Sequence, residues 1–368
     1  MPRRLTVLLL LLLIEPITFV RKFKLSSNSA KIAFPIDLCP PERLALFRKI
    51  KKYESMKQTI LGAGGAIGVE LAKALTSYTT AIRLVSRNPK KINPTDELLS
   101  ADLLDKQQVD KAVEASQVVY LTVGLDYNTR LWQAMWVPLM RNVIDACVKH
   151  DCKLVFFDNV YAIGGDSVEH VTEETPICPT SKKGEVRAEV DRLLLEAVDK
   201  RNLKAIIARA PDFFSDIKDK SLLMNLVYDN LSEGKKAQWF CNAKVVHTTG
   251  CTPDLAKGTA LLGNTNDAYN QIWNLPVDSE RITGEQWINL FAREMNTSNR
   301  YQVLPAWGMR ALGLFVPILR EMYEMRYQYD RDYYFDSSKF NTAFGYTPTT
   351  NAQAVKQTVE RLRASATV

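Results

Sequence analysis

The sequence predicts an α/β protein built on a doubly wound parallel sheet, with a smaller α-rich part interleaved into it. Short apolar runs alternate with amphipathic helical stretches from residue 56 to residue 211, and a glycine-rich turn follows the first apolar run. From residue 212 to residue 368 the alternation becomes looser and helical patterns dominate. We therefore expect a sheet-based core over 56–211 and a cap over 212–368 that returns some segments to the core.

Charge and composition exclude several classes of protein. Residues 1–55 hold 11 Lys and Arg against 4 Asp and Glu, which leaves 37 basic and 37 acidic residues in 56–368. A neutral body of this kind is not a nucleic-acid-binding protein, which would need a basic face. The six cysteines form no CxxC pair and the three histidines have no chelating spacing, so we expect a reduced, cytoplasmic protein without a metal site.

The first 55 residues need a separate interpretation. Residues 1–20 combine a basic start with an apolar run, as a secretory signal does. The run is interrupted at Glu15-Pro16, lacks a small-x-small cleavage site and is too short to span a bilayer comfortably. We expect 1–55 to be a disordered, dispensable extension or a misassigned start. The alternative is a membrane-surface anchor formed by residues 1–20.

The turn "TILGAGGAIG", residues 59–68, lies between a predicted strand and a predicted helix. Gly62 can adopt a tight turn, Gly65 lets backbone amides approach a pyrophosphate, and Gly68 lets the helix pack against the strand. The helix start adds unpaired N–H groups and partial positive charge. The sequence therefore predicts a dinucleotide-binding loop made of Gly62, Gly64, Gly65, Ala66, Ile67 and Gly68.

The end of the second predicted strand points to the cofactor. Chains that select NAD usually place Asp or Glu there to bond the ribose 2′-hydroxyl. Here "SRNPKK" follows the strand, so Ser86 and Arg87 occupy that place. A guanidinium can bind a 2′-phosphate with two hydrogen bonds, whereas a carboxylate would repel it. We predict NADP(H) in preference to NAD(H), with NAD as the alternative.

The ends of the next two strands complete the expected cofactor site. A third strand over 98–105 ends at Asp102-Leu103, where an adenine ring commonly rests. A fourth strand over 117–125 ends at Val123-Gly124, which would lie under the nicotinamide.

Three further local expectations follow from residue type. We expect Pro138 in the first turn of the helix after the fourth strand. We expect Asp254 to cap a helix N-terminus. Over 307–336, one helical stripe is expected to pack mostly against the core, and its members are Leu312, Phe315, Leu319, Met322 and Arg326.

Together these motifs resemble the short-chain dehydrogenase/reductase superfamily, in its extended or atypical branch of NAD-dependent epimerase/dehydratase-like proteins. The resemblance covers roughly 57–360 and includes "NVYAIGG", "RAPDFF", "HTTGCTPDLAKG" and "DSSKFNTAFGYTP". It implies a Rossmann core, a small interleaved substrate domain, a nicotinamide cofactor and hydride transfer at a carbonyl or alcohol carbon.

The family's chemistry uses a Tyr and a Lys four residues apart on a helix, where the ammonium lowers the pKa of the phenol. In "CPTSKKGEVRAEVD" that spacing holds only Ser181 with Glu185 and Lys183 with Arg187. Two interpretations remain open. An enzyme has moved its proton donor to Tyr161, assisted by Lys183, or the protein binds a dinucleotide without turnover as a sensor or scaffold.

The resemblance also implies that Arg209 and Asp212 line the substrate cleft, the alternative being an ion pair that fixes their loop. We expect His247 to be structural, the alternative being that it faces the cleft. Few basic anchors accompany the aromatic segment 307–336, so we expect a small, hydrophobic carbonyl or alcohol as substrate. The patterns do not separate a reductase from an epimerase and do not give an oligomeric state.

Overall fold

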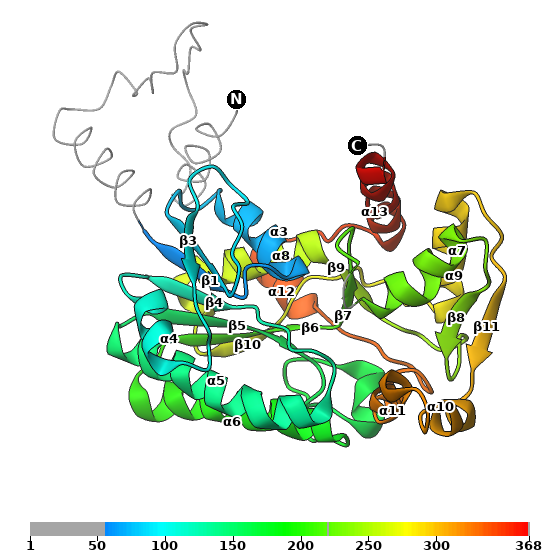
Figure 1. Cartoon of the computed structure of the whole chain (residues 1–368), viewed down its shortest axis with the longest axis horizontal. Helices are drawn as coiled ribbons and strands as arrows, with labels where there is room; N and C mark the ends of the chain where they lie inside the picture. Colours follow the sequence, from blue (N-terminus) through cyan, green and yellow to red (C-terminus); the bar gives the residue numbers. More distant parts are fainter. Residues whose placement is uncertain (1–55, 219–220, 367–368) are drawn as a thin grey trace, which may run out of the picture.

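A seven-stranded sheet, parallel throughout, forms the centre of the computed structural model, which describes residues 56–218 and 221–366 (Figure 1). The strand order is β10-β6-β5-β4-β1-β2-β3, so the chain starts in the middle and winds outward in both directions. The strands are β1 (Gln58–Leu61), β2 (Ile82–Ser86), β3 (Glu97–Ser100), β4 (Val118–Leu121), β5 (Lys153–Asn159), β6 (Ala205–Ala210) and β10 (Gln271–Asn274).

Helices cover both faces of this sheet, as a parallel sheet requires. Figure 1 shows α3 and α8 on one face and α4, α5 and α6 on the other. Their bounds are α3 (Ala66–Leu75), α4 (Lys106–Val113), α5 (Thr129–Lys149), α6 (Lys182–Arg201) and α8 (Thr252–Gly263). The inner strands are buried on both sides, and two separate hydrophobic clusters fill the two layers. The predicted doubly wound fold is confirmed.

A smaller, mostly helical body lies at the carboxyl edge of the sheet. Its own hydrophobic cluster includes Trp239, Trp287, Phe291 and Met309. It contains β8 (Ala237–Phe240), β11 (Tyr301–Leu304), the π-helix η2 (Met224–Tyr228), α7 (Asp229–Ser232), α9 (Gly284–Met295), α10 (Ala306–Leu312), α11 (Pro317–Tyr323) and α13 (Asn351–Ala366).

The two bodies are interleaved along the chain. Strands β7 (Asp212–Phe214) and β9 (Thr249–Cys251) pair in parallel between them, and α8, β10 and α12 (Ser338–Phe344) return to the sheet. Within the described residues there are also three short 3₁₀ helices, η1 (Gly165–His170), η3 (Asn266–Ala268) and η4 (Arg326–Gln328). The boundary at 211/212 stays a prediction, and the expectation for 1–55 lies outside the described residues.

Two local expectations were wrong. Pro138 lies in the interior of the 21-residue helix α5, since that helix already starts at Thr129 under an Asn128 cap. The segment 307–336 is not one helix, because Gly313 ends α10 and Pro317 begins α11. Leu312 and Phe315 consequently point into solvent instead of the core.

Asp254 is not a helix cap either. The cap of α8 is Cys251, and Asp254 occupies the first turn as a buried residue. Its carboxylate accepts hydrogen bonds from the Tyr346 hydroxyl (3.0 Å) and the Thr349 amide (2.6 Å). The residue therefore fastens the C-terminal "FGYTP" element to the helix that packs beside α3.

Across 56–218 and 221–366, no helix combines the length and the apolar character needed to cross a membrane.

Candidate active site

The loop between β1 and α3 contains two positions that only glycine can occupy. Gly62 has φ +98°, and a Cβ there would lie 2.7 Å from the Val123 amide nitrogen. A Cβ on Gly68 would lie 2.6 Å from the Gly62 carbonyl oxygen. The first glycine therefore brings the β1 and β4 loops together, and the second seats α3 directly on the turn.

The tip of the same loop exposes only backbone atoms. Gly64 and Gly65 are exposed, and no atom outside the loop crowds either position. Gly65 precedes α3 as its N-cap and offers no side-chain oxygen, and the first turn holds no acidic residue. The amides of Ala66, Ile67 and Gly68 thus begin the helix without a capping side chain. A helix start of this kind suits a pyrophosphate.

The ends of β2 and β3 lie next to each other beside the tip of this loop. The Ala101 amide donates to the Ser86 carbonyl (3.1 Å), and the Ser100 hydroxyl donates to the Arg87 carbonyl (2.8 Å). The Arg87 side chain is exposed, and the "SRNPKK" stretch that contains it has no carboxylate. Arg87 is therefore available to a ligand that reaches beyond the loop.

Asp102, Leu103, Val123 and Gly124 follow their strands directly. The Asp102 carboxylate accepts a hydrogen bond from the Leu104 amide (3.0 Å), and Leu103 is buried beneath it. Val123 is half-buried against Gly62, and Gly124 is exposed. The structure therefore gathers the predicted cofactor residues at one edge of the sheet.

Tyr161 follows β5 at this edge and is half-buried. Its ring stacks on Trp132 with centroids 6.0 Å apart, and its hydroxyl lies 3.5 Å from that of Tyr127. Burial, followed by the negative charge of Asp212, raises the pKa of Tyr161 well above the ordinary value for a phenol. The hydroxyl consequently stays protonated and serves best as a hydrogen-bond donor.

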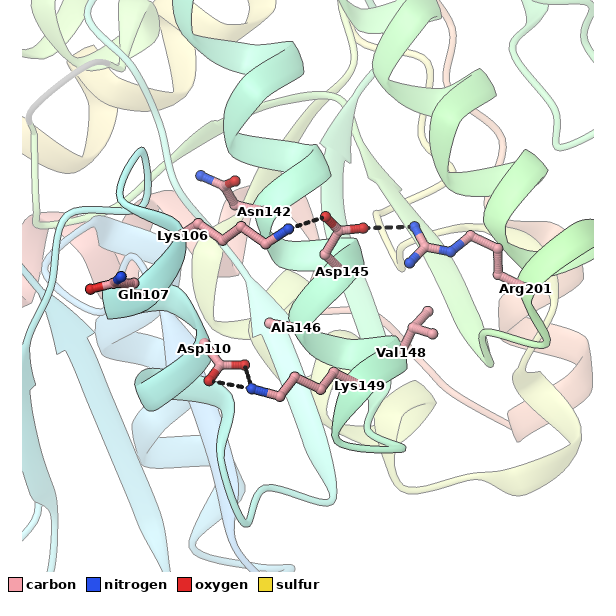
Figure 2. Close-up of a pocket in the computed structure, with 9 residues that line it drawn as sticks. All are labelled: Lys106, Gln107, Asp110, Asn142, Asp145, Ala146, Val148, Lys149 and Arg201. Carbon is pink, nitrogen blue, oxygen red and sulfur yellow. Dashed lines mark hydrogen bonds and ion pairs between the residues drawn. The ribbon is translucent and has the colours of Figure 1, made fainter.

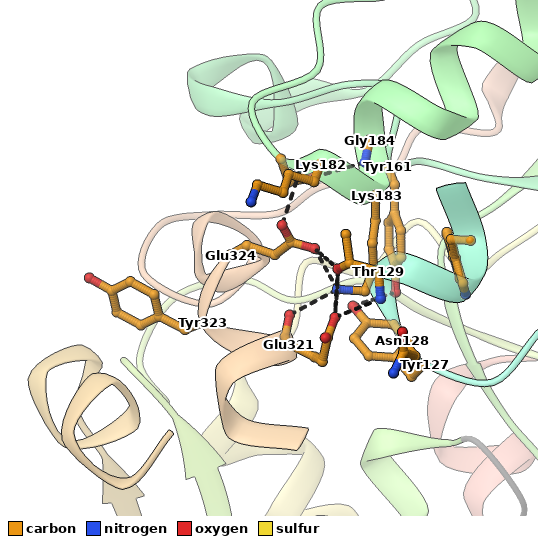
Figure 3. A network of polar contacts seen from close by, with 12 residues as sticks. Tyr127, Asn128, Thr129, Tyr161, Lys182, Lys183, Gly184, Glu321, Tyr323 and Glu324 are labelled. Carbon is orange, nitrogen blue, oxygen red and sulfur yellow. Dashed lines mark hydrogen bonds and ion pairs between the residues drawn. The ribbon is translucent and has the colours of Figure 1, made fainter. Parts of the chain in front are cut away.

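Lys183 does not act on Tyr161 directly (Figure 3). Its fully buried ammonium pairs with the Glu321 carboxylate (2.6 Å) and with Glu324, and it donates to the Thr129 hydroxyl (2.9 Å). It also lies over the Tyr127 ring, 4.6 Å from the centroid. All of these bonds join α6 to α5 and α11. The geometry makes Lys183 a link between the two bodies of the molecule.

Arg209 belongs to a buried ionic cluster and is not on the surface. Its guanidinium lies 3.6 Å from Asp191, and both side chains are completely buried. Arg187 donates to Asp158 next to them (Nε to Oδ1, 2.8 Å). Burial, then the neighbouring charge of Asp158, raises the pKa of Asp191. Arg209 therefore holds α6 against β6, and the expectation that it lines a cleft is not met.

Asp212, the first residue of β7, is an accessible charge of the site, with 22% of its side chain exposed. Its Oδ2 atom accepts a hydrogen bond from the Tyr329 hydroxyl (2.9 Å) and lies 3.1 Å from His247 Nε2. No hydrogen bond from the described residues to Oδ1 is found, so that oxygen can accept one from a ligand.

Both ring nitrogens of His247 have partners. Its Nδ1 lies 3.0 Å from the Gln328 carbonyl oxygen, which can only accept a hydrogen bond. Its Nε2 faces Asp212 Oδ2 at 3.1 Å. The imidazole is therefore positioned beside an accessible carboxylate.

The match to a family model decides the chain's relationship. Residues 59–275 match the model of the NAD dependent epimerase/dehydratase family. The chain belongs to this family. The seven-stranded sheet agrees with solved members of its fold, and the resemblance inferred from the motifs is confirmed.

Solved structures with this fold share little sequence with the chain. A UDP-glucose 4-epimerase from Thermus thermophilus in complex with NAD is 16% identical, with a TM-score of 0.67, over 84% of this chain and all of that one. The dTDP-glucose 4,6-dehydratase DesIV from Streptomyces venezuelae, with NAD and TYD bound, is 14% identical, with a TM-score of 0.68, over 85% of this chain and 98% of that one.

A curated relative matches a shorter stretch. The 3beta-hydroxysteroid-dehydrogenase/decarboxylase isoform 2 of Arabidopsis thaliana is 29% identical over 139 residues, which is 36% of this chain. The chain spans about a quarter of the length of that relative.

Sequence reasoning missed two members of the site, Tyr127 and Tyr329, and it favoured a structural role for His247. Asp212 and His247 are 35 residues apart, and Asp212 and Tyr329 are 117 apart, so no local spacing reveals their contacts. The one available signal was the density of tyrosine in "MYEMRYQYDRDYY", which we attributed to core packing.

A groove on the outer surface lies away from this site (Figure 2). It runs between α4, α5 and the end of α6, and its charges pair with each other, Asp145 with Lys106 and Arg201, and Asp110 with Lys149. Among the described residues, no three His, Cys, Asp or Glu side chains gather closely enough to hold a metal ion.

Proposed function

We propose that the chain binds NADP(H), in preference to NAD(H), and transfers hydride at a carbonyl or alcohol carbon of an apolar small molecule. The observation that carries the proposal is the uncapped start of α3 behind Gly64 and Gly65, with the exposed Arg87 and no carboxylate at the end of β2. When bound, the nicotinamide would supply or accept the hydride.

Different residues of the chain would bind different parts of the dinucleotide. Gly62, Gly64, Gly65, Ala66, Ile67 and Gly68 would bind the diphosphate through backbone amides. Ser86 and Arg87 would bind the 2′-phosphate, Asp102 and Leu103 would contact the adenine end, and Val123 with Gly124 would support the nicotinamide. Each of these positions lies at the carboxyl edge of β1 to β4.

Tyr161 and the Asp212–His247 pair are the proposed proton apparatus. The Tyr161 hydroxyl would donate a hydrogen bond to the substrate oxygen, a role that a protonated phenol can fulfil. The Asp212–His247 pair would supply a proton to that oxygen as hydride reaches the carbon. Lys183 is a positioning residue in this account, because it fixes Thr129 and the neighbouring Tyr127.

The proposed substrate is apolar. Phenols and an imidazole surround Asp212, and burial with the Asp212 charge also raises the pKa values of Tyr329 and Tyr333. Such side chains suit a ring system with one oxygen function better than a nucleotide diphosphate. The name of the curated relative, a hydroxysteroid dehydrogenase, supports this class. The solved relatives named above act on sugar nucleotides, so both classes belong in the test.

A second candidate function, dinucleotide binding without turnover, is supported by a separate set of observations. The usual Tyr and Lys pair is absent from α6, the pKa of Tyr161 is raised, and Lys183 is paired with two carboxylates. A protein that binds the dinucleotide without turning it over, as a sensor or scaffold, is consistent with these facts.

Turnover assays distinguish the two functions. The full chain would be incubated with NADPH or NADP⁺ and panels of ketones, hydroxysteroids and sugar nucleotides, and both absorbance and products would be followed. We expect Asp212→Asn and Tyr161→Phe each to lower kcat by about a hundredfold or more with cofactor binding unchanged. Tyr334→Phe, which alters a partly exposed phenol elsewhere, is the matched control.

Three outcomes would change the assignment. Tight cofactor binding without any turnover would favour the sensor. Full activity in Tyr161→Phe would exclude Tyr161 from the mechanism. Full activity in Asp212→Asn would exclude the Asp212–His247 pair as the proton source.

A further inference from the structure

The hairpin formed by α10 and α11 exposes the largest group of apolar side chains among the described residues. Nine large hydrophobic side chains are exposed in this part of the chain, and six of them lie within residues 307–318, so they form one patch. Trp307, Leu314 and Phe315 are 76%, 79% and 84% exposed. The other members are Leu312, Val316 and Ile318. We call these six residues the hairpin patch.

The hairpin patch is supported by ordered structure. Met309 and Met322 are buried on its inner side, where they join the core of the smaller body. The turn is hydrogen-bonded through the amides of Gly313 (to Met309, 2.8 Å) and Val316 (to Leu312, 2.8 Å). The apolar side chains are therefore held outward by a built turn, which is typical of an interaction surface.

The other end of α11 reaches the candidate active site. Glu321 and the following Glu324 pair with Lys183, which lies over Tyr127 (Figure 3). The patch is thus rigidly connected to the residues around Tyr161.

The charged residues around the hairpin patch indicate which kind of partner it can bind. Between Val303 and Arg320 the sequence contains no Asp or Glu, and Arg310 and Arg320 are both exposed. Trp307 and Arg310 lie one turn apart on α10, and Leu314 follows in the turn after that helix. Apolar and tryptophan side chains bordered by arginine suit the interface of a membrane that contains anionic lipids.

We propose that the hairpin patch docks on the surface of an anionic membrane, with its apolar side chains in the acyl boundary and Arg310 and Arg320 among the headgroups. Two other occupants match the charge less well. A second copy in a twofold dimer would place these arginines near their own counterparts. The apolar run of residues 1–20 carries Arg3 and Arg4, which would also face them.

The N-terminal run would add a second attachment to the same membrane. Its basic start and leucine-rich stretch are typical of a membrane-surface segment, and stable attachment commonly needs two signals. The docking proposal does not depend on turnover, so it stands or falls separately from the proposed function.

One tryptophan makes the test specific in the full chain. Trp307 is exposed, whereas Trp132, Trp136, Trp239, Trp273 and Trp287 are buried, and residues 1–55 contain no tryptophan. A change of tryptophan emission on mixing with vesicles therefore reports on residue 307. The vesicles would be phosphatidylcholine with phosphatidylserine, with and without bromine on the acyl chains, and pure phosphatidylcholine.

We expect a blue shift and quenching by brominated chains on the phosphatidylserine vesicles, both lost in Trp307→Phe. Leu314→Ser with Phe315→Ser should weaken vesicle binding at least about tenfold, because two anchors lose their burial in the acyl boundary. Arg310→Gln with Arg320→Gln should reduce the preference for phosphatidylserine. Leu98→Ser, an exposed leucine on β3, is the matched control and should change nothing.

Four results would overturn the proposal. Vesicle binding without quenching of Trp307 would assign attachment to residues 1–20 alone. A Trp307 emission already blue-shifted without vesicles would mean that residues 1–20 cover the patch. A shift that follows protein concentration without lipid would mean a dimer. No binding to phosphatidylserine vesicles would reject a membrane partner altogether.

Discussion

Two helices that begin at the carboxyl edge of the sheet, α3 and α6, start in opposite ways. The first turn of α3 has no capping side chain and no acidic residue. The first turn of α6 is occupied, since Ser181 Oγ accepts from the Gly184 amide (3.0 Å) and Glu324 accepts from the Lys182 amide (3.2 Å). Only the start of α3 therefore has its positive end available to an outside anion.

The starts of α3 and α6 therefore have different roles: one can bind a ligand, and the other connects parts of the protein. Backbone at α3 is left for a ligand, whereas side chains at α6 are satisfied by α5 and α11. In this family member the position expected for proton chemistry on α6 has become a joint between the two bodies. The proton chemistry that we propose has moved to Asp212 and His247.

The largest expected effect breaks the joint at α6. Lys183→Met would leave two carboxylates facing each other beside Thr129, and we expect a loss of about 3 kcal/mol in the free energy of unfolding. Cofactor affinity should change less than about threefold, since no cofactor residue is touched. Denaturant unfolding and cofactor titration would measure the two quantities.

Lys182→Met is the matched control, because its side chain is exposed one residue earlier on the same helix. It should change stability by less than about 0.5 kcal/mol. A stable Lys183→Met variant that has lost cofactor affinity would mean that Lys183 faces the cofactor and would contradict this comparison.

The next effect breaks the glycine loop. Gly62→Ala places a Cβ in a left-handed backbone conformation and against Val123, so we expect a loss of about 2 kcal/mol and of most cofactor binding. Gly64→Ala, where a Cβ meets nothing within 4 Å, should leave stability almost unchanged. Equal stability losses in the two variants would show that the loop has another geometry.

A smaller effect is expected on the preference for NADPH over NADH. Arg87→Ala removes the exposed guanidinium at the end of β2. We expect the ratio of NADPH to NADH affinity to fall about tenfold, which corresponds to about 1.4 kcal/mol for a charge-assisted contact. Fluorescence titrations with both cofactors would give the ratio. An unchanged ratio would remove Arg87 from cofactor selection.

The smallest expected effect is on the stability of the fold at low pH. Burial acts to raise the pKa of Glu321, but the Lys183 ammonium and the Thr129 hydroxyl outweigh it, so the pKa is lowered from its ordinary value of 4.5. A lowered carboxylate pKa stabilises the fold above the ordinary value, and this contribution disappears as the pH falls through the folded value. Thermal melting of wild type and Glu321→Gln should therefore converge below pH 4.5. A constant gap between them would exclude this role for Glu321.

Much of the fold could be predicted because its signals are local. The apolar runs predicted the first four strands in order, and the spacing of Gly62, Gly65 and Gly68 located the strand-to-helix turn. The wrong expectations concern residues whose environment is set elsewhere. Pro138 lies inside a helix because α5 starts earlier than the apolar pattern suggested, and Gly313 with Pro317 divides a stripe that looked continuous.

The candidate site was less predictable, because its contacts join distant parts of the chain. Lys183 pairs with residues almost 140 positions later, which gives it a structural partner that no spacing on α6 reveals. Arg209 begins the "RAPDFF" motif, which the resemblance assigned to the substrate cleft, yet it is buried beside Asp191 in the core. The Asp212–His247 contact likewise depends on the pairing of β7 with β9.

The central claim is that the bare amides at the start of α3 hold the diphosphate of a nicotinamide dinucleotide. Titration calorimetry of the full chain tests it most directly, with Gly62→Ala as the comparison. We predict measurable heat with NADPH, weaker binding of NADH, and little heat from the variant. The absence of heat with either nucleotide at about millimolar concentration, in protein shown to be folded, would contradict the account.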